Sequence, residues 1–111
     1  MLPELNKGLS AIMPTVYGQW FPGQAPALPY IVVVDSGRDD QFADNTHYYN
    51  VWTYRLEIYF NRKDPITEQK IESFLSANDW SWSDEGDQYI DTEKIFEHIY
   101  YVEKGEMTNG D

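Results

Sequence analysis

Residues 48–60 read Tyr-Tyr-Asn-Val-Trp-Thr-Tyr-Arg-Leu-Glu-Ile-Tyr-Phe, and this stretch decides the fold. Apolar side chains recur at every second position, so they lie on one face of a strand and predict a core-facing side. They are Trp52, Tyr54, Leu56, Ile58 and Phe60. The opposite face is amphipathic and carries Val51, Thr53, Arg55, Glu57 and Tyr59. Such a face meets either a covering helix or a protein partner, and the sequence leaves both alternatives open.

Two strands and two loops are predicted in the residues before this strand. Residues 30–35 form an unbroken apolar, β-branched run, which is typical of a strand covered on both faces. Residues 21–29 contain three prolines and a glycine, so they predict an extended loop. A short strand is expected at 16–20, and the polar stretch 36–45 is expected to be a loop or hairpin tip.

Two helices are predicted. Asp64 is a natural N-cap, Pro65 suits the first helical position, and Asn78 is a suitable stop, so we expect a helix over 65–77. A shorter helix is predicted over 2–12 from the spacing of its leucines, although Gly8 disfavours a helical interior.

The C-terminal part predicts two more strands. Residues 79–84 place Trp80 and Trp82 on one face of a short strand, residues 85–87 are expected to turn, and residues 94–103 alternate as a further strand. The resulting fold class is α+β (α/β), with the element order α-β-β-β-α-β-β and two helices on a mostly antiparallel sheet of four to five strands. We expect one domain over 1–105 and a flexible C-terminal tail over 106–111.

Composition narrows the classes of function. The chain has 111 residues, 19 acidic and 8 basic, for a formal net charge of −11, with two His and no Cys. A basic face for phosphates is therefore not expected, and a zinc site built on cysteines is excluded. No apolar run is long enough to span a membrane. The first residues do not resemble a signal peptide, which predicts assembly in a cytoplasm.

The sequence shows no recognisable catalytic motif. His47 and His98 are interpreted as a loop-edge residue and a packed strand residue. Asp84, Glu85 and Asp87 are interpreted as a solvated turn. A calcium loop that begins at Asp79 is not expected, because Gly86 comes two residues too late for it. We therefore predict no enzyme activity, no catalytic residue, no metal site and no cofactor.

Three groups of segments carry a resemblance to a known family. They are residues 28–33 with 42–45, then 54–60 leading into Lys63-Asp64-Pro65, and finally 82–84 with 89–94 and 96–101. In this order they resemble the tail terminators, or tail-to-head joining (tail completion) proteins, of long-tailed bacteriophages that infect Gram-positive hosts. The resemblance covers about residues 28–103.

The resemblance implies a structural virion protein that caps the tail tube, ends its polymerisation and helps join the tail to the head. The implied partners are further copies of the chain in a hexameric ring, the major tail protein and a head-completion connector protein. DNA would pass through without specific binding, no membrane would be involved, and the protein would reside in the tail or neck of the virion. We expect the interface at Arg38, Asp39, Phe42, Arg55, Glu57 and Tyr59.

Two alternatives remain open. The acidic charge is compatible with an inhibitor that mimics DNA and binds a basic groove, for which the carboxylates would have to form a regular track. The other alternative is a different neck component, such as a stopper.

Overall fold

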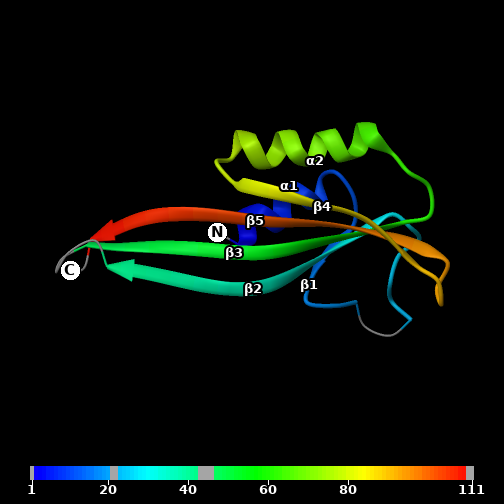
Figure 1. Ribbon diagram of the computed structural model, residues 1–111, viewed down its shortest axis with the longest axis horizontal. Helices are drawn as coiled ribbons and strands as arrows, with labels where there is room; N and C mark the ends of the chain where they lie inside the picture. Colours follow the sequence, from blue (N-terminus) through cyan, green and yellow to red (C-terminus); the bar gives the residue numbers. More distant parts are fainter. Residues whose placement is uncertain (1, 21–22, 43–46, 110–111) are drawn as a thin grey trace.

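The computed structural model describes residues 2–20, 23–42 and 47–109, and within these it describes only the backbone of 37–42, 47–50 and 106–109. The elements are α1 (Leu2–Ser10), β1 (Thr15–Tyr17), β2 (Tyr30–Phe42), β3 (His47–Phe60), α2 (Pro65–Ala77), β4 (Ser81–Ile90) and β5 (Ile95–Asn109). The strands form one five-stranded sheet in the order β1-β2-β3-β5-β4. Only the β1–β2 pair is parallel. The predicted α+β fold with a mostly antiparallel sheet is confirmed (Figure 1).

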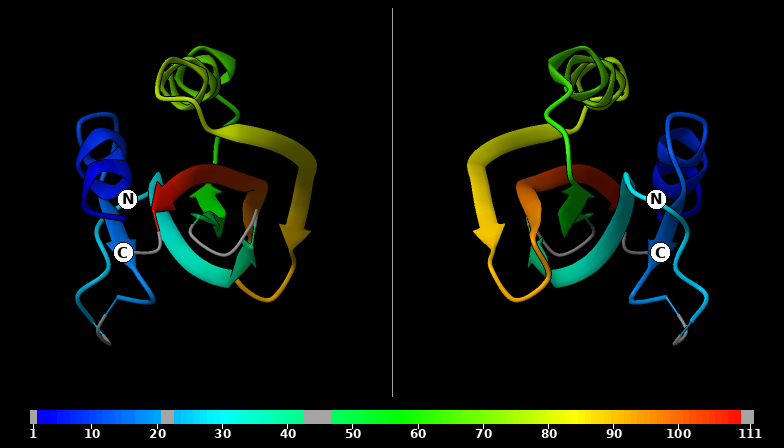
Figure 2. Two further views of the ribbon diagram at one scale, coloured as in Figure 1. Left: turned by 90° about the vertical axis from the view of Figure 1, so that its left-hand side faces the viewer. Right: turned by 90° about the vertical axis from the view of Figure 1, so that its right-hand side faces the viewer.

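Both helices pack on the same face of the sheet. The leucines of α1 and the buried residues of α2 join one apolar cluster with alternate residues of β2, β3 and β5 (Figures 1 and 2). Its members are Leu5, Leu9, Met13, Ile31, Val33, Tyr54, Leu56, Ile58, Phe60, Ile71, Leu75, Trp80, Tyr100 and Val102. The period-two set predicted in residues 52–60 is thus the core face of β3, because burial of these side chains is the main stabilising term for a small domain.

Three of the strands continue well beyond the helices. The outer parts of β2, β3 and β5 form an extended arm at one end of the molecule, next to the C-terminus (Figure 1). The radius of gyration of the Cα atoms is 15.7 Å, compared with about 13 Å for a compact chain of this length. We call residues 37–42, 47–50 and 105–109 the arm.

The arm corrects two sequence-based predictions. Residues 36–42 belong to β2 rather than to a loop, and 43–46 lie outside the described residues. Residues 106–109 of the predicted tail pair with β3, from Glu106 opposite Asn50 to Asn109 opposite His47, whereas 110–111 lie outside the described residues. Both predictions were wrong because they relied on the polar composition of these segments. Backbone pairing with the central strand β3 continues the neighbouring strands, whatever their side chains are.

The predicted turn at 85–87 is also wrong. β4 runs through it, and its register with β5 shifts between Asp84 and Asp87. Gly86 has a φ of +80°, and its N–H donates to Asp84 Oδ1 at 2.7 Å. A glycine in the left-handed region allows a β-bulge, which inserts residues without ending the strand. The residues that predicted a turn therefore form a β-bulge within β4.

Helix α2 has the predicted bounds. Asp64 caps its N-terminus by accepting from the backbone N–H of Thr67 at 3.2 Å and from its hydroxyl at 2.6 Å. Asn78 ends it, donating its backbone N–H to Phe74 O at 3.2 Å. Helix α1 ends at Ser10, two residues earlier than expected.

Gly8 marks the contact between the two helices. A Cβ placed on Gly8 would lie 2.0 Å from the ring of Phe74 on α2. Alanine favours a helix by about 1 kcal/mol over glycine, but overpacking costs about 1–3 kcal/mol. We therefore expect Gly8→Ala to lower the free energy of unfolding by about 1 kcal/mol, measured by urea unfolding with tryptophan fluorescence.

Two further variants control this prediction. Ser10→Ala, on an exposed position of the same helix, should be neutral or slightly stabilising. In a Phe74→Ala background, where the ring is gone, Gly8→Ala should no longer be destabilising. A Gly8→Ala protein as stable as the parent would mean that the helices do not meet closely at this point.

Candidate functional site

The face of the sheet opposite the helices is the principal free surface. Register places three rows of side chains on it, and we call these residues the outer face. They are Tyr30, Tyr59 and Glu97, then Val32, Glu57 and Ile99, then Val34, Arg55 and Tyr101. Both helices pack on the opposite face, so the alternative of a helix covering Arg55, Glu57 and Tyr59 is wrong.

Three predicted interface residues form a network on the outer face. Glu57 is 9% exposed and lies at its centre. Arg55 Nη2 lies 2.6 Å from Glu57 Oε2, and the Tyr59 hydroxyl donates to Glu57 Oε1 at 2.9 Å. Burial raises the pKa of Tyr59, and hydrogen bonds to Glu97 and Glu57 raise it further, so this hydroxyl stays protonated. The network is held in place before any partner binds.

The loop after β1 covers one end of the outer face. Trp20 packs edge-on against Tyr30 at 5.9 Å between ring centroids, and Tyr30 packs against Tyr59 at 5.4 Å. Two donors of this region, Trp20 Nε1 and Arg55 Nε, are buried without a hydrogen-bond partner. Buried donors without acceptors are rare in folded proteins.

The other three predicted interface residues lie in the arm. Arg38, Asp39 and Phe42 are part of β2, opposite Trp52, Val51 and Tyr48 of β3. Their side chains lie outside the described residues. The six predicted residues therefore fall at two places, namely the arm and the outer face.

A polar cluster lies on the other side of the sheet, beneath the first turns of α2. We call His98, Asp84, Asp87, Lys63 and Glu68 the His98 cluster. His98 is 3% exposed, with its Nδ1 in contact with Asp87 Oδ1 and its Nε2 2.8 Å from Asp84 Oδ1. Lys63 Nζ lies 2.8 Å from Asp87 Oδ2 and 2.7 Å from Glu68 Oε2.

Electrostatics fixes the charge of two members of the cluster. Burial alone would raise the pKa of Asp87, but hydrogen bonds from Lys63 and His98 outweigh it and hold that pKa below its ordinary value. Burial alone would lower the pKa of Lys63, but Asp87 and Glu68 outweigh it and raise that pKa. Asp87 is thus a carboxylate and Lys63 an ammonium at neutral pH.

This cluster was not predicted from the sequence. Asp84 and Asp87 were interpreted as part of a solvated turn, and His98 as a packed strand residue. His98 does pack on the ring of Tyr100, with centroids 4.6 Å apart. The bulge at Gly86 turns both aspartates to the same face as His98, although they are three positions apart. Only the alternation of His98 with buried residues of β5 hinted that it points inward.

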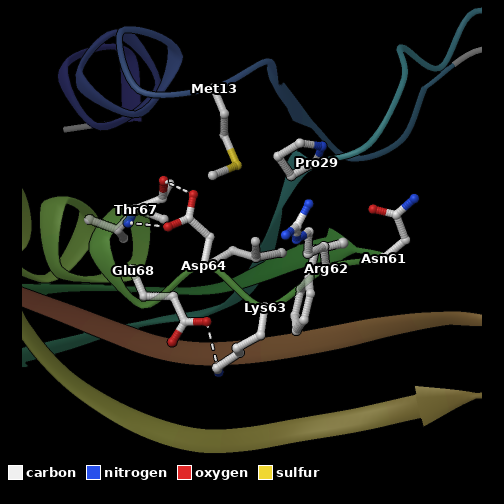
Figure 3. A pocket seen from close by; sticks show the side chains of 11 residues that line it. Met13, Pro29, Asn61, Arg62, Lys63, Asp64, Thr67 and Glu68 are labelled. Atoms are coloured by element: carbon white, nitrogen blue, oxygen red, sulfur yellow. Dashed lines mark hydrogen bonds and ion pairs between the residues drawn. The ribbon is translucent and has the colours of Figure 1, made fainter.

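A cavity of about 460 Å³ borders the cluster (Figure 3). Its floor is apolar, and its lining includes Met13, Ile58, Phe60 and Ile71. Four of its polar residues bond in pairs, Asp64 with Thr67 and Lys63 with Glu68. In Figure 3 the side chains of Lys63 and Glu68 point away from Met13, towards the strands β5 and β4. The Thr67 hydroxyl is bonded to Asp64 at 2.6 Å as part of the cap of α2.

Comparison with known proteins does not identify a family for this chain. No family model matches the chain, and no curated protein matches it in sequence. Within the described residues, no helix has the length and apolar character needed to cross a membrane.

The lowered pKa of Asp87 predicts how the cluster contributes to stability. A carboxyl group with a lowered folded-state pKa stabilises the fold above its unfolded pKa of about 3.9, and this contribution is lost as the pH falls through the folded pKa. Asp87→Asn should therefore lower the free energy of unfolding at pH 7 by about 1 kcal/mol, a value reduced for partial exposure.

Urea unfolding at a series of pH values would measure the effect. The difference between Asp87→Asn and the parent should shrink once the pH is below about 3.9. Asp91→Asn, in the exposed turn between β4 and β5, is the matched control and should change stability little at any pH. A deficit of Asp87→Asn that is independent of pH would contradict the ionic contribution.

Proposed function

We propose that this protein is a structural assembly protein of the tail-terminator kind, which forms a ring at the end of a bacteriophage tail. The observation that carries the proposal is the outer face, an aromatic and charged sheet surface without a covering helix. Tyrosine and arginine are the residue types enriched in the centres of protein interfaces. An assembly protein needs such surfaces for its copies and partners.

The exposed guanidinium of Arg55 supports contact with an acidic chain. The side chain of Arg55 is 38% exposed, and carboxylates of a neighbouring copy are suitable partners for it because the chain is strongly acidic. The contact is heterologous, with the outer face of one copy against a different surface of the next, which is the type that closes into rings.

The arm provides a second contact. Its three paired strands extend beyond the helices, so it reaches past the body of its own copy. Arg38, Asp39 and Phe42 in the arm would contact the next copy, the major tail protein or the head connector. The lumen of an acidic ring would repel DNA phosphates and let the DNA pass without binding.

The His98 cluster weighs against the DNA-mimic alternative. Seven acidic residues lie between Asp79 and Glu97 in the sequence, and a mimic would need them in an exposed track. Asp84 and Asp87 instead contact the buried His98, and Asp87 also pairs with Lys63. Two of the seven acidic residues therefore pair with groups inside the fold.

Tyr101→Glu tests the outer face as the ring contact. Tyr101 is 40% exposed there, and a glutamate at its position can pair with the neighbouring Arg55, so the monomer should stay folded. Loss of an aromatic residue at the centre of an interface costs about 2 kcal/mol, so association should weaken roughly 30-fold. Light scattering over a range of concentrations, together with cross-linking on purified tails, would measure it.

Tyr89→Glu is the matched control. Tyr89 is 52% exposed but lies in register with Phe96 and Phe60 on the face that also carries the core. The same substitution there should leave association unchanged. Equal effects of the two substitutions would mean that added charge, and not the outer face, governs assembly.

Electron microscopy of virions assembled without the protein distinguishes the roles. Overlong tails are expected for a terminator, because nothing then stops polymerisation of the tail tube. Tails of normal length that fail to join heads would replace the terminator role with that of a stopper or another neck component. Intact infectious virions would reject a role in tail assembly.

A further inference from the structure

We propose that the His98 cluster binds one divalent transition-metal ion, with His98, Asp87 and Glu68 as ligands and Asp84 beside them. This inference does not depend on the proposed function in the tail. It concerns the charged groups that lie beneath α2, on the face of the sheet opposite the outer face.

The three ligands come from three different elements. His98 belongs to β5, Asp87 to β4 and Glu68 to the first turn of α2. Each offers one ligand atom, and these atoms all lie within 4.8 Å of one another. Ligand atoms about 2.0–2.2 Å from one ion are at most about 4.4 Å apart. Small side-chain rotations therefore suffice to close the site.

The balance of charge favours a divalent cation. Three carboxylates of the cluster, on Glu68, Asp84 and Asp87, face one ammonium, on Lys63. A histidine that binds a metal is neutral, so with a metal ligated by His98 the side chains would leave a formal excess of two negative charges. A divalent ion would cancel the excess.

The buried histidine points to the kind of metal. His98 is 3% exposed, its Nδ1 faces Asp87, and its Nε2 lies 2.8 Å from Asp84 Oδ1. Metal-bound histidines commonly direct their other ring nitrogen to a carboxylate in this way. A mixed set of one imidazole and carboxylates suits Zn²⁺ and its neighbours, whereas Ca²⁺ and Mg²⁺ prefer oxygen ligands alone.

In the structure, the ammonium of Lys63 lies where the metal ion is proposed to bind. Its ammonium bonds to both acidic ligands, Glu68 and Asp87, so a metal ion must displace it. The side chain of Lys63 is 44% exposed and can turn into solvent. Metal and ammonium therefore compete for the same two carboxylates. This competition distinguishes a specific metal site from an acidic surface that attracts cations without binding one at a defined position.

The test is calorimetric titration of the purified full chain with Zn²⁺ at pH 7, after removal of metal by a chelator. Co²⁺ absorption serves as a second, spectroscopic probe of nitrogen ligation. We expect one ion per chain and a rise in Tm with metal. His98→Asn should weaken binding at least 10-fold, whereas Lys63→Met should tighten it several-fold because the competing ammonium is gone.

His47→Asn is the matched control, since it removes the only other histidine, and it should leave the affinity unchanged. Lys63→Met keeps the proposal testable if His98→Asn fails to fold. Three results would each overturn the proposal: no stoichiometric binding of Zn²⁺ by the parent, equal binding of Mg²⁺ and Zn²⁺, or an affinity for Zn²⁺ unaffected by Lys63→Met. A pairing of His98 with its two aspartates and no metal would produce the first result.

Discussion

The central position of β3 is the constraint on which the rest of the structure depends. β3 pairs with β2 on one side and with β5 on the other, from one end of the strand to the other. Its apolar residues alternate with those of the amphipathic face, so its register determines which side chains lie on each face of the sheet. A shift by one residue would turn Leu56 and Ile58 away from the helices and bury Arg55 and Glu57 beneath them. Both helices lie on one face because only that row of β3 is apolar.

Polar contacts as well as apolar packing connect α2 to the sheet. Only Ile71 and Leu75 of this helix are buried. Glu72 accepts from the Tyr100 hydroxyl at 2.7 Å, Trp82 Nε1 donates to Ser76 at 3.1 Å, and Lys63 pairs with Glu68. Buried polar networks stabilise when they are fully satisfied and cost free energy when they are not. The docking of α2 thus depends on the charge state of the groups beneath it, which connects the His98 cluster to the stability of the whole domain.

The two faces of the sheet have different physical characters. One face encloses the core and the His98 cluster, whose charged groups pair with one another. The outer face carries the network of Arg55, Glu57 and Tyr59, with buried donors that lack acceptors. The arm extends the same sheet beyond the helices. A protein that works through contacts with other chains needs surfaces of this kind.

Local signals in the sequence determined the central strand, the bounds of α2 with its cap at Asp64, and the α+β class, because period and capping chemistry act over a few residues. Tertiary structure alone decided the rest. Pairing with β3 made strands of 36–42 and 106–109, since backbone hydrogen bonds disregard polar side chains. The bulge at Gly86 brought Asp84 and Asp87 to His98, and packing of Phe74 explains Gly8 in a helix. These features depend on groups far apart in the chain, whose proximity no local pattern encodes.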